Sequence, residues 1–103
     1  MKFYAAGINY RKCDMDIRGQ YALPPDLILK VLNRAKQAGV PEVFVLSTCN
    51  RTEIYGLAHS ADTLINLLCE ETAGNAHQFR SAAYVHKQAA AADHLFHVAA
   101  GLD

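Results

Sequence analysis

Two strand-like segments joined by only two residues constrain the fold of this chain more than any other feature. Residues 42–48 are a short apolar run, typical of a central strand covered on both faces, and residues 51–58 form the second segment. Only Cys49 and Asn50 connect them, and asparagine tolerates the left-handed backbone that tight turns use. The two segments are therefore predicted to pair as a hairpin with Cys49 at its apex.

The rest of the chain alternates strand-like and helix-like segments. Pro24 and Pro25 open a helix whose apolar residues recur every three or four positions, and Gly39 ends it. Ser60 is a capping residue at the start of a second helix. The remaining expected elements are strands at 2–10 and near 82–86 and helices at 61–73 and 88–100. A polar stretch with a short helical turn is expected at 11–18, and a short polar helix or loop at 75–81.

This order, β-α-β-β-α-β followed by α, predicts an α+β fold. It matches the ferredoxin-like plan, an antiparallel sheet with helices packed on one face, plus a C-terminal helix. A chain of 103 residues supports one modest core, so residues 1–103 are expected to form one domain. The chain stops at Ala-Ala-Gly-Leu-Asp without a polar tail, and we expect it to belong to a longer protein.

Charge and hydropathy exclude several classes of protein. Ten Lys and Arg residues balance ten Asp and Glu residues, so net charge offers no global attraction to nucleic acid or membrane, and an RNA contact would depend on local patches. No apolar run approaches the ~18 residues that span a bilayer, and none near the start suits a secretory signal. We expect a cytoplasmic protein with no membrane partner.

Three cysteines form an odd set without a CxxC pair. This pattern argues against a disulfide framework or a structural zinc site and favours free thiols in a reducing compartment. Cys69 lies in a predicted helix among leucines, where packing is its expected role. Cys13 adjoins Asp14, whose carboxylate raises the pKa of a neighbouring thiol, so Cys13 is predicted to be a poor nucleophile.

Cys49 is the strongest candidate for chemistry because it lies in a tight turn with polar neighbours. The thiolate is the reactive form of cysteine, and an ordinary thiol is mostly protonated at neutral pH. The Arg51 guanidinium and the converging backbone N–H groups of the turn are expected to lower the pKa of this thiol and to hold an oxyanion. The alternative is a small, buried and inert side chain, a common role of free cysteine.

Arg51 and His94 are the candidate partners of the thiol. The planar guanidinium of Arg51 suits a carboxylate or a phosphate, and Glu53 on the same strand face is an alternative partner. His94 shares a helix face with His97, but no third ligand is evident, so no metal is predicted. Near Cys49, His94 would polarise a substrate or transfer protons; the alternative is a purely structural histidine.

The remaining histidines and the glycines indicate no further functional site. His59, His77 and His86 are expected in solvated or turn positions. The glycines are scattered singly, with neither a GxGxxG nor a GxxxxGK[ST] pattern, so the chain contains no recognisable nucleotide-binding motif.

The run Val-Leu-Ser-Thr-Cys-Asn-Arg-Thr-Glu-Ile-Tyr at residues 45–55 resembles the active-site signature of the glutamyl-tRNA reductase family. Gly-Ile-Asn at 7–9 with Asp-Ile-Arg at 16–18 is similar to the N-terminal segment of the family, and residues 94–103 are similar to the segment that ends its catalytic domain. Together the resemblance spans the whole chain.

The resemblance implies that residues 1–103 are the N-terminal catalytic, glutamyl-tRNA-binding domain. The family reduces glutamyl-tRNA(Glu) to glutamate-1-semialdehyde with NADPH, the first committed step of tetrapyrrole synthesis. Cys49 matches the nucleophile that holds the glutamyl group as a thioester. Together with Cys49, the residues that match substrate-binding positions are Thr48, Asn50 and Arg51. His94 matches a histidine that the family needs for activity.

By the same resemblance, the NADPH-binding domain and a helical dimerisation domain lie downstream in a longer protein, and no cofactor-binding residue is assigned within 1–103. The implied partners are glutamyl-tRNA(Glu), a second copy that binds through the C-terminal domain, and glutamate-1-semialdehyde aminomutase. The segment from Asn9 to Asp14 departs from the family pattern Asn-His-Lys-Thr-Ala-Pro. A role for that histidine therefore does not carry over, whereas Arg11 and Lys12 offer charge for RNA phosphates.

Two other functions compete with the reductase domain. A ferredoxin-like module that binds RNA or protein without catalysis would keep Cys49 as a buried, unreactive thiol. A cysteine hydrolase would use Cys49 with His94 and transfer the acyl group to water.

Overall fold

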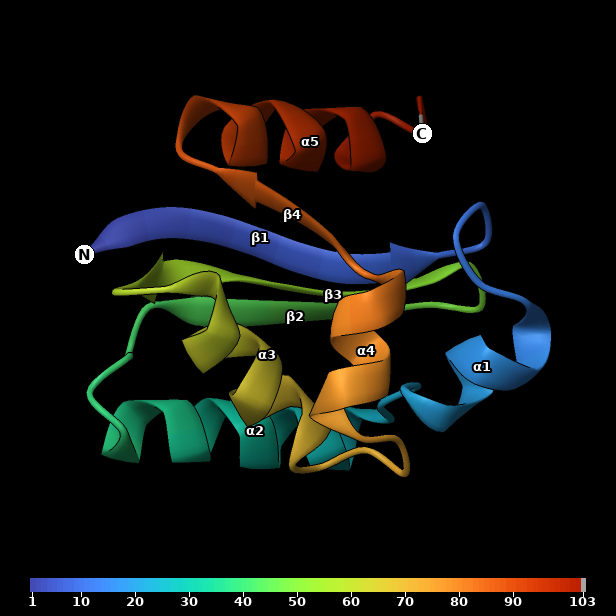
Figure 1. Ribbon diagram of the computed structural model, residues 1–103. Helices are drawn as coiled ribbons and strands as arrows, with labels where there is room; N and C mark the ends of the chain where they lie inside the picture. Colours follow the sequence, from blue (N-terminus) through green and yellow to red (C-terminus); the bar gives the residue numbers. More distant parts are fainter. Residues whose placement is uncertain (103) are drawn as a thin grey trace.

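Four antiparallel strands form one sheet in the order β2-β3-β1-β4 (Figure 1). The computed structural model describes residues 1–102. The elements are β1 (Lys2–Asn9), α1 (Met15–Gln20), α2 (Pro25–Gln37), β2 (Val43–Ser47), β3 (Arg51–Ala58), α3 (Ala61–Cys69), α4 (Ala76–Ala82), β4 (Tyr84–Lys87) and α5 (Ala89–Ala99). This strand order and the antiparallel pairing are those of the ferredoxin-like plan, so the predicted fold class is confirmed.

The two central strands, β1 and β3, pair along their whole length. Their register runs from Lys2 opposite Ala58 to Asn9 opposite Arg51 without a bulge. All but one of the residues of β3 are buried. Because successive side chains of a strand point to opposite faces, these two strands supply side chains to both sides of the sheet.

Different helices cover the two faces of the sheet. α2, α3 and α4 lie against one face and α5 lies against the other, as Figure 1 shows. The main core, between the sheet and the first three of these helices, is built around Ile8, Val31, Ile54, Leu64, Leu68 and Phe79. A smaller cluster under α5 contains Ala5, Tyr55 and Ala91, with Phe3 and Leu95 partly buried against it. The C-terminal helix therefore makes the second face of the sheet an interior surface.

The prediction of a doubly covered central strand at residues 42–48 is wrong. β2 is the edge strand of the sheet, none of its residues is fully buried, and Phe44 is 42% exposed. Val43 and Val45 pack against the main core, which accounts for half of the apolar run. The strand that is buried on both faces is β3, whose sequence begins Arg-Thr-Glu. The apolar composition of residues 42–48 indicated a buried strand. The order of strands in the sheet instead makes β3 a central strand and β2 an edge strand.

The helix limits differ modestly from expectation. α3 ends at Cys69 rather than at residue 73, and the predicted cap Ser60 accepts a hydrogen bond from the Thr63 N–H. Of the helix or loop expected at residues 75–81, the structure has the helix, α4, which is capped by the side chain of Asn75. α1 is likewise a full helix, capped by Asp14, rather than a single turn. Short capped helices escape a search for apolar periodicity because few of their residues enter the core.

Candidate active site

Cys49 lies at the exposed apex of the β2–β3 hairpin. The Thr48 N–H donates to the Arg51 carbonyl at 2.8 Å, and the Asn50 N–H donates to Thr48 Oγ1 at 3.2 Å, so both residues that flank the thiol are held in place. The Tyr10 N–H donates to the Asn50 carbonyl at 2.9 Å, which ties the loop after β1 to the same turn. The thiol is thus open to an incoming molecule while the backbone around it is fixed.

Glu53 is fully buried beneath α5 and is the centre of a polar network. Its Oε1 accepts from the Tyr55 hydroxyl at 2.8 Å, and its Oε2 accepts from the Tyr84 hydroxyl at 2.5 Å. The same Oε2 lies 2.5 Å from His94 Nε2 and 3.6 Å from Arg51 Nη1. Burying an acidic side chain is costly unless such partners surround it. The predicted alternative pairing of Arg51 with Glu53 is present.

A glycine makes this network possible. In the sheet register, Gly7 on β1 stands between Glu53 on β3 and Tyr84 on β4, so the Tyr84 hydroxyl reaches Glu53 across Gly7. A Cβ at Gly7 would lie 2.7 Å from Glu53 Cγ and 2.8 Å from the Thr52 carbonyl oxygen. Burial, followed by the hydrogen bond to Glu53, raises the pKa of the Tyr84 phenol, which therefore remains a protonated donor.

Two histidine rings stack beside this network. The rings of His86 on β4 and His94 on α5 are 4.5 Å apart, with 29° between their planes. The Tyr84 ring lies 5.0 Å from His94. The prediction of a solvated or turn position for His86 is wrong, because β4 lies next to β1 and places that ring under α5. Tyr84 is a site residue that the sequence did not indicate; the signal available was an acidic residue inside a strand, at Glu53, which requires buried donors.

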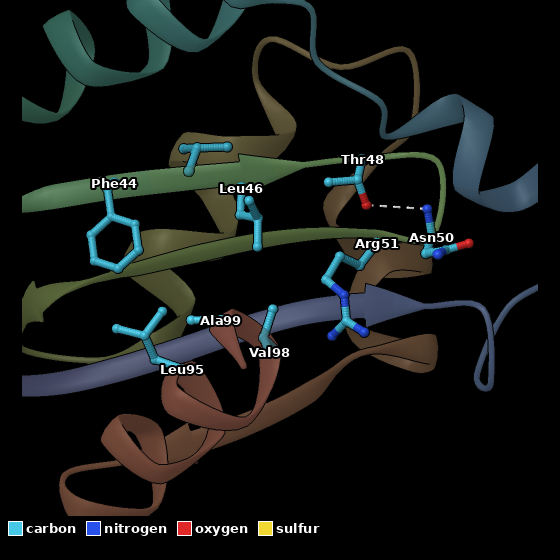
Figure 2. A pocket seen from close by; sticks show the side chains of 9 residues that line it. Phe44, Leu46, Thr48, Asn50, Arg51, Leu95, Val98 and Ala99 are labelled. Atoms are coloured by element: carbon cyan, nitrogen blue, oxygen red, sulfur yellow. Dashed lines mark hydrogen bonds between the residues drawn. The ribbon is translucent and has the colours of Figure 1, made fainter. Parts of the chain in front are cut away.

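An open cavity of about 430 Å³ lies between β2, the hairpin turn and α5. Figure 2 shows Phe44 and Leu46 from β2 facing Leu95 and Val98 from α5. The polar residues of its lining are Thr48, Asn50 and Arg51. The cavity therefore combines apolar walls with one guanidinium, a lining that suits a short chain ending in a carboxylate.

The thiol and the predicted histidine are not joined. Cys49 lines a second, smaller hollow of about 210 Å³, which lies against α1. His94 lies against Glu53 instead, and within residues 1–102 no hydrogen bond connects it to Cys49. His94 is thus linked to Arg51 through Glu53. Thr48 lines both the 430 Å³ cavity and the 210 Å³ hollow.

The other two cysteines are buried and free. Cys69 belongs to the main core, which confirms packing as its role, and burial raises the pKa of its thiol to about 11. For Cys13, burial is the larger cause of a raised pKa and Asp14 is the second cause, while Arg18 opposes both. The predicted direction for Cys13 is therefore confirmed, although the sequence indicated only the smaller of the two causes.

Among residues 1–102, no three His, Cys, Asp or Glu side chains lie close enough together to hold a metal ion. Over the same range, no helix has the length and apolar character needed to cross a membrane.

Comparison with known proteins identifies the family. Residues 6–103 match the family model of the N-terminal domain of glutamyl-tRNAGlu reductase. This chain belongs to the glutamyl-tRNA reductase family. The glutamyl-tRNA reductases of Flavobacterium psychrophilum and Christiangramia forsetii are each 46% identical to it over 98% of the chain, and that of Pseudomonas fluorescens is 37% identical over the whole chain. The chain spans about a quarter of the length of these relatives.

The solved structures agree at the level of the fold. Glutamyl-tRNA reductase from Methanopyrus kandleri superimposes with a TM-score of 0.69 over 97% of this chain and 22% of that one, at 23% identity. The two chains therefore share their fold over nearly the whole length of this chain.

Thiol reactivity provides a first test. A chromogenic disulfide reagent at neutral pH is expected to modify Cys49 at least roughly tenfold faster than Cys13 or Cys69, because the two buried thiols react only after local opening. Stopped-flow absorbance measures the phases. Cys49→Ser should remove the fast phase alone, and a fast phase that survives in this variant would contradict the assignment.

Replacing Gly7 tests the close packing of the network. Gly7→Ala is expected to lower the free energy of unfolding by about 1–3 kcal/mol, because the new methyl group overlaps Glu53 and the β3 backbone. Urea denaturation measures the effect. Gly19→Ala is the matched control, since a Cβ there meets nothing within 4 Å and a helical Gly→Ala change is neutral or stabilising. Equal stabilities of the two variants would rule out the overlap.

The buried carboxylate is tested by an isosteric amide. Glu53→Gln is expected to lower the free energy of unfolding by about 1–3 kcal/mol, because an amide cannot accept from all the donors that surround this position. Glu70→Gln, which weakens only an exposed ion pair with Arg34, should cost less than about 1 kcal/mol. Chemical denaturation measures the free energy of unfolding of both variants. A Glu53→Gln protein as stable as the control would show that the network does not contribute to stability.

Proposed function

We propose that this chain is the domain of a glutamyl-tRNA reductase that transfers the glutamyl group of glutamyl-tRNA(Glu) to Cys49. The thioester would then be reduced with NADPH to glutamate-1-semialdehyde, the entry to tetrapyrrole synthesis. The observation that carries this proposal is the exposed thiol at the apex of the hairpin, inside the run of residues 45–55. A thioester carbonyl is more electrophilic than an ester carbonyl, so covalent capture divides the reduction into two easier steps.

The transfer step uses the residues of the turn. The thiolate Sγ of Cys49 attacks the carbonyl carbon of the ester, the C–S bond forms, and the bond from that carbon to the ribose oxygen breaks. The ribose oxygen takes up a proton, and the tRNA leaves with a free hydroxyl group. The backbone N–H groups of a tight turn are suited to stabilise the oxyanion that forms on the way.

The 430 Å³ cavity is the proposed site of the glutamyl group. Arg51 lines it, and its planar fork suits the side-chain carboxylate of a glutamyl group, while Thr48 and Asn50 line the end nearest the thiol. Leu95 and Val98 would contact the methylene groups. This arrangement would favour an acidic acyl group over an apolar one.

His94 acts in this proposal as a positioning residue. Its Nε2 lies 2.5 Å from Glu53 Oε2, and that oxygen lies 3.6 Å from Arg51 Nη1, so the histidine sets the orientation of the guanidinium through the carboxylate. By holding Glu53, His94 fixes the orientation of Arg51 without touching the substrate itself.

The residues described here do not fit NADPH. No glycine-rich loop follows a strand and opens a helix, which is the arrangement that binds the pyrophosphate of a dinucleotide. NADPH would supply the hydride from a site in another part of a longer protein, and no contact with it is assigned to this chain.

Exposure of Cys49 also bears on the competing functions. The non-catalytic binding module requires a buried thiol at position 49, and the thiol is exposed. The hydrolase shares the thioester with the reductase and differs only in the final acceptor. Water can reach an exposed thioester, so slow release of glutamate is expected when no hydride donor is present.

The decisive experiment follows labelled glutamate from glutamyl-tRNA(Glu) onto the protein. After nuclease digestion of the tRNA, the native chain should retain acid-precipitable label that neutral hydroxylamine releases, as a thioester does. Cys49→Ser should reduce this label roughly 10³-fold or more, the scale of loss when a nucleophile is removed. Cys69→Ala, which changes only a buried thiol, should retain the label. Labelling that persists in Cys49→Ser would overturn the proposed function.

A further inference from the structure

The hollow of about 210 Å³ lies on the other side of the Cys49 turn from the proposed glutamyl cavity. Met15, Arg18 and Gly19 of α1 line it together with Ala22, and Thr48 and Cys49 close it from the hairpin. Its volume is below the roughly 300–1,000 Å³ of pockets that enclose a whole small-molecule ligand. The hollow therefore suits one part of a larger molecule that continues into solvent.

Arg18 is the charged residue of this hollow, and only part of its guanidinium is satisfied by hydrogen bonds. Its Nη1 donates to the Cys13 carbonyl at 2.9 Å, which fixes the guanidinium. Its Nε is buried and has no hydrogen-bond partner. Within residues 1–102 no carboxylate forms an ion pair with it. Buried donors normally find partners, so a fixed guanidinium without a counter-ion beside a nucleophile points to an anionic ligand.

The surroundings of the hollow are mildly basic. Arg11 and Lys12 are exposed in the loop that the Tyr10 N–H ties to the Asn50 carbonyl. The acidic residues nearby are Asp14, whose side chain caps α1, and Asp16, which is exposed in the first turn of that helix. α1 and the loop before it thus carry three positively charged side chains and two carboxylates. One of the carboxylates is already used in the cap.

We propose that this hollow binds the ribose-phosphate end of the acyl donor, with Arg18 contacting a phosphate of the 3′-terminal nucleotide and Met15 lying against the sugar. This inference rests on the proposed function. An ester presented to Cys49 has two halves, the acyl group and the leaving alcohol, and each needs its own space beside the sulfur. The glutamyl group occupies the cavity with Arg51, and the nucleotide occupies the hollow with Arg18. Thr48, which lines both, stands between them.

Two acyl donors separate this role from a general effect on the thiol. Glutamyl-tRNA(Glu) carries the nucleotide, whereas the p-nitrophenyl ester of glutamate has the same acyl group and no phosphate. Arg18→Gln is expected to lower the second-order rate of Cys49 acylation by glutamyl-tRNA about 10- to 100-fold, as expected for a lost charge-assisted contact. With the nitrophenyl ester the rate should stay within about twofold of the native rate, since this donor makes no phosphate contact. Mass spectrometry of the acylated chain measures both rates.

Arg34→Gln is the matched control, because it removes the same charge from α2, where Arg34 pairs with Glu70 and Glu71. It should leave both rates unchanged. In addition, the dependence of the tRNA reaction on salt should weaken in Arg18→Gln, with the log–log slope smaller by about one. Thermal melting confirms that each variant is folded.

The outcomes separate the two proposals. Equal slowing with both donors would make Arg18 a residue that positions the turn, and no slowing with glutamyl-tRNA would leave the hollow without a ligand; either result overturns the inference while the thioester stands. If neither donor acylates Cys49 in the native chain, the proposed function itself fails, and this inference fails with it.

Discussion

A fully buried acidic side chain in the middle of the sheet organises the functional half of this domain. Glu53 is surrounded by two phenols, an imidazole and a guanidinium, which belong to β3, β4 and α5. The low-dielectric interior strengthens each of these contacts, and for the same reason the loss of any one of them would lower the stability of the fold. The carboxylate therefore links the position of Arg51 to the docking of α5. The absence of a side chain at Gly7 is what allows Tyr84 to join.

The hairpin turn places the exposed thiol of Cys49 in the smaller of two differently lined spaces, and the neighbouring Thr48 lines both of them. On the α5 side lies the larger cavity, which has apolar walls and the guanidinium of Arg51. On the α1 side lies the smaller hollow, which contains the guanidinium of Arg18. A thiol in such a place can meet an ester whose acyl and alcohol halves differ in charge and size. The two-residue connection between β2 and β3 keeps Cys49 close to Thr48, Asn50 and Arg51, so the thiol lies next to residues that line the larger cavity.

Much of this could be predicted from local patterns. The hairpin, the helix that opens at Pro24, the Ser60 cap and the burial of Cys69 depend on neighbours in the sequence, and all are present. The centrality of β3, the ring stack of His86 and the separation of His94 from Cys49 were not predictable. These depend on strand order and on which face each helix covers, and neither leaves a periodic trace in the chain.

The sequence by itself determined the class of fold, the family and the cysteine at the apex of a tight turn, because strand and helix periods, caps and a contiguous signature are encoded by residues close along the chain. Only the tertiary structure decided that His94 meets Glu53 rather than the thiol, and that a guanidinium from α1 stands on the far side of Cys49. The physical reason is that these contacts join segments up to 41 residues apart, and packing of the two sheet faces brings them together.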